Sequence, residues 1–234
     1  MESTPQNILI TGASSGIGRA AALMLAERGH RLFLHGRSVE RTEAIANESG
    51  AVGFLTGDLA APHAAEALLT GAVEKMGSID CVVHAAGVGL IRPALETTDA
   101  EFSRVMNINA RVTFLVAREA ARIMAAQKRG LFITIPGILG KAVMKNAVAY
   151  IASKFAVTGM IKAMAQEFQR QGVRFTLLHL GGVDSPFWDD LAMTVQRDKM
   201  ISPETAAACI LTAIEMPGNL AMNEMTLQPE SHQL

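Results

Sequence analysis

Cysteine is scarce in this 234-residue chain, which holds only two. Cys81 and Cys209 each lie in an apolar run and form no CxxC or Cys/His pattern. This excludes a disulfide framework and a zinc site of the usual spacing, and no other metal site is expected. The two thiols are expected to be small core residues of a protein from a reducing, cytoplasmic compartment.

An excess of charge of one sign is also absent. Lys and Arg together number 21 and Asp and Glu 22, which leaves a formal net charge of −1. The positive charges are spread along the chain, so no basic block could release counterions from a phosphate backbone. Nucleic acid is therefore not expected as a partner.

Long hydrophobic runs are missing as well. No uninterrupted apolar stretch approaches the roughly twenty residues that cross a bilayer, so no membrane association is expected. The first seven residues are polar and contain Glu2 but no basic residue, which does not fit a signal peptide.

Short apolar runs alternating with longer helical patterns are what the chain does have. The runs predict strands at 7–11, 31–35, 51–55, 81–85, 131–135, 173–178 and 222–227. Helices are predicted at 15–28, 39–49, 60–76, 98–127 and 147–170, with shorter ones near 186–193 and 203–215. Strands that are apolar on both faces are typical of parallel sheets covered by helices. The pattern predicts one α/β domain over 1–234, a doubly wound (Rossmann-like) parallel sheet of about seven strands with helices on both faces.

A glycine-rich turn joins the first predicted strand to the first predicted helix, with the sequence Thr11-Gly12-Ala13-Ser14-Ser15-Gly16-Ile17-Gly18. The free N–H groups and positive dipole end of a helix N-terminus suit a pyrophosphate, and glycines let the backbone approach it. The spacing is GxxxGxG rather than GxGxxG. The alternative is a tight turn built of small residues for packing only.

The sequence TGASSGIG resembles the cofactor motif of the short-chain dehydrogenase/reductase (SDR) family, and the similarity extends from about residue 7 to residue 229. The resemblance implies that Gly12, Ser14, Ile17 and Gly18 line the pyrophosphate and the nicotinamide side of a dinucleotide. Ser15 and Gly16 complete the same turn.

The end of the second predicted strand favours NADP(H) over NAD(H). Gly36 stands where NAD-preferring relatives usually carry an Asp that binds the ribose hydroxyls, and Arg37 follows, whose guanidinium suits a 2′-phosphate. Against this, many NADP-preferring relatives have a basic residue in place of Ser15. Alternatively, Arg37 is a solvated side chain at the end of the strand.

Further cofactor contacts are implied at the next strand ends. Thr56-Gly57-Asp58-Leu59 resembles the adenine-side segment, where the Asp meets the adenine amino group; Asp58 could instead, or also, be the N-cap of the following helix. In His84-Ala85-Ala86-Gly87, Ala86 and Gly87 match the family's Asn-Asn-Ala-Gly segment. Ala85 replaces an Asn that helps to tie the central strands together.

Tyr150-Ile-Ala-Ser-Lys154 matches the family's YxxxK element, and residues i and i+4 share one helix face. By the resemblance, Tyr150 exchanges the proton with the substrate oxygen, while Lys154 lowers the pKa of Tyr150 and holds the nicotinamide ribose. Asn109 resembles the family's active-site Asn. The alternative is a Tyr packed at a helix start beside a solvated Lys.

One usual active-site residue is missing. Most relatives carry a Ser thirteen residues before the Tyr, where this chain has Gly137, preceded by Pro136. The loss of one hydrogen-bond donor to the substrate oxygen typically costs about 10²–10³ in rate. Weak activity is therefore expected, and a Ser restored at position 137 is expected to recover part of it.

The segment at about 183–203 corresponds to the family's substrate loop. Val183 and Ser185 are expected near the nicotinamide carboxamide, and an apolar lid could form from Phe187, Trp188, Leu191 and Met193. An ordinary amphipathic helix explains these residues nearly as well. The long helices at 98–127 and 147–170 are the surfaces by which the family forms dimers and tetramers. A homo-oligomer is expected, with Ala117, Ala121, Ala156 and Ala163 as small outward-facing residues.

Two functional hypotheses remain open on the sequence. The first is an NADP(H)-dependent oxidoreductase that transfers a hydride between nicotinamide and a small carbonyl or alcohol. The second is a dinucleotide-binding pseudoenzyme that acts as a sensor or binds a partner protein. Tyr150, Lys154 and Asn109 favour the first hypothesis, and Gly137 favours the second.

Overall fold

A seven-stranded parallel sheet forms the centre of the molecule, described by a computed structural model that covers residues 4–191, 193–217 and 219–231. The strand order is β3-β2-β1-β4-β5-β6-β7, and every neighbouring pair is parallel. The strands are β1 (Asn7–Thr11), β2 (Arg31–Gly36), β3 (Gly53–Thr56), β4 (Cys81–His84), β5 (Gly130–Thr134), β6 (Val173–Leu180) and β7 (Glu224–Leu227). The order reverses between β1 and β4, which is where open α/β sheets bind ligands.

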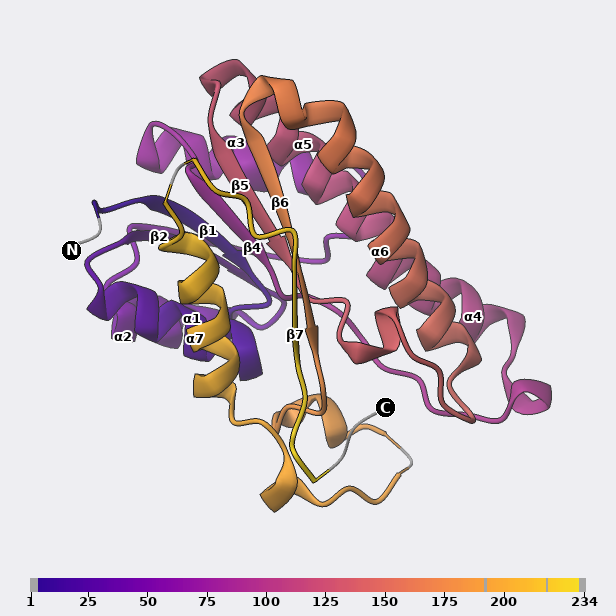
Figure 1. Cartoon of the computed structure of the whole chain (residues 1–234). Coiled ribbons are helices and arrows are strands. Elements are labelled where there is room, and N and C mark those ends of the chain that lie inside the picture. The colour runs from indigo at the N-terminus through magenta and orange to yellow at the C-terminus, as the bar shows by residue number, and fades with distance from the viewer. Residues whose placement is uncertain (1–3, 192, 218, 232–234) are drawn as a thin grey trace.

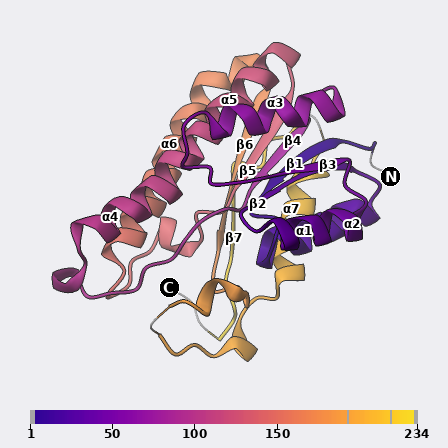
Figure 2. The same ribbon diagram turned by 180° about the vertical axis from the view of Figure 1, so that it is seen from behind.

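Helices cover both faces of the sheet, as predicted (Figure 1). One layer holds α1 (Gly16–Glu27), α2 (Val39–Ser49) and α7 (Pro203–Ile214). The other holds α3 (Ala64–Met76), α4 (Asp99–Met106), α5 (Val112–Gln127) and α6 (Val148–Phe168). Figure 2, seen from behind, shows α4 and one end of α6 extending beyond the sheet on the side where the 183–203 segment also lies.

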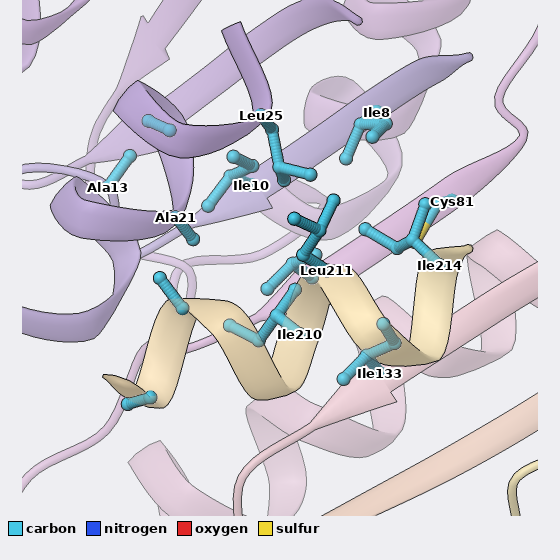
Figure 3. Packing of buried hydrophobic residues seen from close by; sticks show 14 of the residues in the cluster. Ile8, Ile10, Ala13, Ala21, Leu25, Cys81, Ile133, Ile210, Leu211 and Ile214 are labelled. Atoms are coloured by element: carbon cyan, nitrogen blue, oxygen red, sulfur yellow. The ribbon is translucent and has the colours of Figure 1, made fainter. Parts of the chain in front are cut away.

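Two separate cores follow from the alternation of side chains along the strands. Ile8, Ile10 and Val83 face the layer of α1, α2 and α7, whereas Leu9 and Val82 face the layer of α3, α5 and α6. Figure 3 shows the first core, in which Ile210, Leu211 and Ile214 of α7 meet Ile8, Ile10 and Cys81 of the strands and Leu25 of α1. Cys81 is fully buried, as expected of a core residue.

Two predicted helices differ from the sequence expectation. The helix predicted at 60–76 begins only at Ala64, because the Asp58 side chain accepts a hydrogen bond from the Ala60 N–H and closes a turn before it. Asp58 is therefore not the N-cap of α3, a position that His63 occupies. The helix predicted near 186–193 is only a short 3-10 turn, Pro186–Trp188.

The long helical region at 98–127 is continuous but changes its winding. A π-helical turn, Asn107–Arg111, separates α4 from α5, and the Val112 N–H donates to the Asn107 carbonyl five residues earlier. π-turns are rare and occur frequently at functional sites. Asn109 lies in the middle of this turn.

The helical segment Val148–Gln171 is long and apolar enough to cross a membrane, although single lysines interrupt its apolar stretches. About a third of its most apolar window is buried, and the segment packs on β6 and α5.

The small residues expected to face outward divide into two pairs. Ala117 and Ala121 are fully buried against the sheet, so that part of the expectation is wrong. Both lie on the face of α5 that carries Val116 and Ala120, which the sheet covers. On α6, Ala156 is half-buried and Ala163 is exposed.

Candidate active site and dinucleotide cleft

The glycine turn leads into an N-terminus of α1 that is prepared for an anion. The helix has no acidic residue in its first turn, and no side chain caps it. A β-carbon on Gly12 would lie 2.8 Å from the Ala86 nitrogen, and one on Gly18 would lie 2.3 Å from the Gly12 carbonyl oxygen. The two glycines thus allow the turn to press against the 85–87 segment and against its own helix. A pyrophosphate fits this backbone cradle.

The end of β2 lies beside the same turn, since His35 pairs with Thr11 in the sheet. A β-carbon on Gly36 would lie 2.3 Å from the Thr42 hydroxyl oxygen and 3.0 Å from the Ser14 β-carbon. The space that an acidic side chain would need at this position is therefore filled by Thr42. This packing is incompatible with the carboxylate that holds the ribose hydroxyls of NAD in relatives.

Two arginines, Arg37 and Arg41, follow Gly36 closely in the sequence. Arg37 is exposed and forms no hydrogen bond or ion pair with any residue in the described ranges. Arg41, one turn later on α2, is exposed and lines an open pocket with Ser14, Ser15 and Gly16. Arg19 lines the same pocket but is held by both carboxylate oxygens of Glu48, at 2.9 and 2.8 Å.

The remaining expected cofactor residues lie around the same edge of the sheet. Leu59 is buried, Ala86 is half-buried and Gly87 is exposed at the end of β4. Ser185 lies against the glycine turn, because a β-carbon on Gly16 would be 3.1 Å from that of Ser185. The Val183 side chain belongs to the core.

Asn109 and Lys154 come together over Gly87, and the Tyr150 ring lies beside Lys154. A β-carbon on Gly87 would lie 3.3 Å from the Asn109 Oδ1 and 3.7 Å from the Lys154 Nζ. The Lys154 Nζ lies 5.4 Å from the centre of the Tyr150 ring and donates to the Ile135 carbonyl at 3.1 Å. Asn109 is fixed on both ends of its amide, accepting from the Val88 N–H and donating to the Val88 carbonyl, each at 2.9 Å.

The protonation of the Tyr–Lys pair differs from the sequence expectation. Burial raises the pKa of Tyr150 above its ordinary value, and burial lowers the pKa of Lys154 to about 8. Lys154 was expected to lower the pKa of Tyr150, but its ammonium lies over the ring face and is directed to the Ile135 carbonyl. In this arrangement burial is what raises the pKa of the Tyr150 phenol.

Gly137 has a backbone that a side chain would strain. Its φ is 71° and its ψ is 177°, a region that essentially only glycine occupies. Space itself is available, since a β-carbon there would meet only the Leu180 carbonyl oxygen, at 3.4 Å. A Ser at this position would therefore be strained on the backbone that Gly137 adopts.

Of the expected lid residues, Phe187 packs against the Tyr150 ring, and Trp188 packs against Phe187. The Phe187 and Tyr150 rings lie 5.8 Å apart, and Trp188 meets Phe187 edge-on at 5.4 Å. The Trp188 indole N–H donates to the Val183 carbonyl at 2.8 Å, which fixes the start of the loop. Phe187 and Leu191 both touch the position of Gly89. Met193 is exposed and is not part of this contact.

Three further residues near the site, Arg41, Thr42 and His84, were given no role in it by the sequence patterns. Arg41 lies in the first turn of the helix that follows Arg37, and this closeness in sequence is a signal that could have found it. Thr42 and His84 had no such signal, because their roles depend on neighbours that the sheet brings together. His84 bridges Thr11 and Thr113, as described below.

This fold and this arrangement of residues agree with comparisons to known proteins. The sequence profile of the short chain dehydrogenase family matches residues 6–196. The chain therefore belongs to the short-chain dehydrogenase family, whose members are oxidoreductases that bind a nicotinamide cofactor.

Particular relatives cover nearly the whole chain. It is 32% identical to a sepiapterin reductase of Chlorobaculum tepidum over 235 residues, 96% of each chain. An alcohol dehydrogenase of Thermococcus sibiricus, solved with 5-hydroxy-NADP, has a TM-score of 0.88 at 24% identity and covers 97% of this chain and 98% of its own. A 3-ketoacyl-(acyl-carrier-protein) reductase of Brucella melitensis, solved with NADH, has a TM-score of 0.87 at 22% identity, covering 94% and 95%. Both structures show the fold that the chain shares.

Proposed function

We propose that this protein is an NADP(H)-dependent oxidoreductase that transfers a hydride between nicotinamide and a small carbonyl or alcohol. The observation that carries the proposal is the convergence of Asn109 and Lys154 at Gly87, next to the glycine turn, with the Tyr150 ring beside Lys154. The test is a panel of ketones and aldehydes with NADPH, followed at 340 nm. Oxidation of NADPH that depends on the carbonyl supports the proposal, and its absence over the whole panel contradicts it.

Each of the site's side chains would have a separate role in the proposed hydride transfer. The bound dinucleotide supplies or accepts the hydride. The Tyr150 phenol, neutral because burial raises its pKa, delivers a proton to the carbonyl oxygen during reduction and takes it back during oxidation. Lys154 would hold the nicotinamide ribose, and Asn109 would keep the surroundings of Lys154 and Tyr150 in place. Phe187 and Trp188 shield the reacting centre from water and offer an apolar wall to the substrate.

The proposed preference for NADP(H) is supported by the end of β2. The 2′-phosphate would meet Arg37 and Arg41, while Thr42 fills the position from which a carboxylate would hold NAD(H). Charge-assisted hydrogen bonds of this kind contribute roughly 1.5–3 kcal/mol.

NADPH is therefore expected to bind more tightly than NADH by about 10- to 100-fold. Titration of the nucleotide fluorescence measures both affinities. Arg37→Ala and Arg41→Ala should each weaken NADPH binding and leave NADH binding unchanged. Arg170→Ala, an exposed arginine that follows α6, is the matched control and should change neither. Equal affinities in the wild type, or a preference that survives in Arg37→Ala/Arg41→Ala, would contradict the assignment.

A second function, dinucleotide binding without efficient turnover, is favoured by one observation. Gly137 lacks the hydroxyl that relatives place at the substrate oxygen, and its backbone conformation disfavours regaining one. In this case NADPH binds as above, but the carbonyl panel gives no turnover. The protein would then act as a sensor or as a partner-binding module.

We also expect a homo-oligomer, a tetramer or a dimer, that uses α4, α5 and α6. Phe102, Phe114 and Phe155 are partly exposed on these helices, between 39% and 43%. Light scattering at micromolar concentration should give a multiple of the 24.9 kDa chain mass. Phe155→Glu should lower that mass, whereas Val39→Glu, on the opposite layer, should not. A monomeric wild type would contradict the expectation.

A further inference from the structure

A chain of buried hydrogen bonds runs behind the proposed active site. The Thr11 hydroxyl lies 2.8 Å from the His84 Nδ1, and the His84 Nε2 lies 3.0 Å from the Thr113 hydroxyl oxygen. The Thr113 hydroxyl donates to the Asn109 carbonyl at 2.5 Å. Each of these four residues is at most 2% exposed, so no solvent competes for the bonds. The chain connects the last residue of β1, directly before the glycine turn, to the centre of the π-turn.

The direction of these bonds follows from counting hydrogens. The backbone carbonyl of Asn109 can only accept a hydrogen bond, so the single hydrogen of the Thr113 hydroxyl is donated to it. Thr113 must then accept from His84, which places the ring hydrogen on Nε2. The His84 Nδ1 becomes the acceptor for the Thr11 hydroxyl. Burial, helped by the charge of Lys154, lowers the pKa of His84 to about 3, and the ring is neutral at ordinary pH.

This chain of hydrogen bonds ends at Asn109, whose side chain makes further bonds toward Tyr150. From Asn109, the side-chain amide donates to the Ser153 hydroxyl at 3.0 Å, and Ser153 donates to the Tyr150 carbonyl at 2.7 Å. The Asn109 side chain and the Lys154 ammonium lie over the same glycine, Gly87. The position of the π-turn backbone therefore decides where Asn109 stands relative to Tyr150 and Lys154.

We propose that His84 is a positioning residue, which holds the π-turn and its Asn109 in place through the Thr113 hydroxyl. The same ring joins β1 to β4 and α5, a link for which Ala85 offers no side-chain group. The Nε2–H side of the ring serves Asn109, and the Nδ1 side serves the strand pairing. The inference rests on the proposed function for its kinetic consequence only.

The contributions of the two His84 ring nitrogens can be measured separately by substitution. In His84→Gln the amide group can reach the Nε2 position and still donate to Thr113, whereas in His84→Asn it reaches only the Nδ1 position, toward Thr11. Both variants leave a buried polar atom without a partner, so both should lower the Tm. Only His84→Asn should lower kcat, by about 10- to 100-fold, because Asn109 is misplaced. KM for the carbonyl and the affinity for NADPH should stay unchanged.

Thr113 supplies a milder matched pair should a His84 variant fail to fold. Thr113→Val removes the hydroxyl at nearly constant volume, and Thr113→Ser keeps it. The proposal expects Thr113→Val to lower kcat like His84→Asn and Thr113→Ser to behave like the wild type. In an Asn109→Ala background, Thr113→Val should have no further effect on kcat, since the two then act through one group.

A readout without turnover separates this inference from the proposed function. Amide hydrogen exchange of a peptide covering 107–112 should accelerate in His84→Asn and Thr113→Val and stay slow in His84→Gln and Thr113→Ser. If the wild type reduces no carbonyl, the proposed function fails and the exchange pattern alone decides the role of His84. Equal exchange in Gln and Asn variants, or kcat losses that simply follow the Tm, would overturn the inference.

Discussion

Tyr150→Phe should reduce kcat for carbonyl reduction by about 10²–10⁴-fold, the usual contribution of a positioned acid–base group. The variant removes the phenol hydrogen and retains the ring that packs on Phe187. The phenol oxygen makes no hydrogen bond with any residue in the described part of the chain, so the fold should lose little. Initial rates at saturating NADPH, followed at 340 nm, measure the effect, and an unchanged NADPH affinity shows that the cofactor site is intact.

Because Tyr150 is the only tyrosine in the chain, its ionisation can be observed directly. Burial raises the pKa of Tyr150, so the absorbance at 295 nm should titrate above the ordinary value near 10. A phenol with a raised pKa in the folded state stabilises the fold below pH 10, and this contribution is lost as the pH rises through the folded value. Turnover that persists in Tyr150→Phe would remove Tyr150 from the proposed chemistry.

Gly137→Ser should have two opposing effects, and Gly137→Ala separates them. Both variants place a β-carbon on a backbone with φ of 71°, which costs about 1–3 kcal/mol of stability. Only the Ser variant adds a hydrogen-bond donor, which is worth at most about 10²–10³ in rate. We therefore expect lower Tm values for both variants and a higher kcat for Ser than for Ala. The ratio of the kcat values of the Ser and Ala variants measures how much the hydroxyl contributes to the rate, because both variants carry the same backbone strain.

Pro136 adds a constraint on the same backbone, because its ring fixes φ. Replacement of Pro136 and Gly137 together by Ser gives the backbone freedom to adopt the path that an L-residue needs, and is expected to gain more than Gly137→Ser alone. Equal kcat values for the Ser and Ala variants, in both backgrounds, would show that no donor is missing. An active wild type would then hold the substrate oxygen by another group.

Much of the fold could be predicted from the sequence because local patterns determine it. Apolar runs such as Cys81–His84, buried on both faces, are typical of a parallel sheet covered by helices. The glycines of the 12–18 turn and the four-residue spacing of Tyr150 and Lys154 are local as well, and they indicated the cofactor cleft and one helix face. The structure confirms the sheet and its two helical layers, and it brings the three expected catalytic side chains together.

Tertiary structure decided what depends on neighbours that are distant in the sequence. Burial raises the pKa of Tyr150, and no local pattern reports how deeply a ring is covered. Thr42 fills the space beside Gly36 only because α2 packs back onto β2. His84 lies between Thr11 and Thr113, 73 and 29 residues away, because parallel pairing sets β4 beside β1 and α5 packs on β4. Sequence spacing carries the periodicity of helices and strands, but contacts across a sheet exist only once burial has fixed which faces meet.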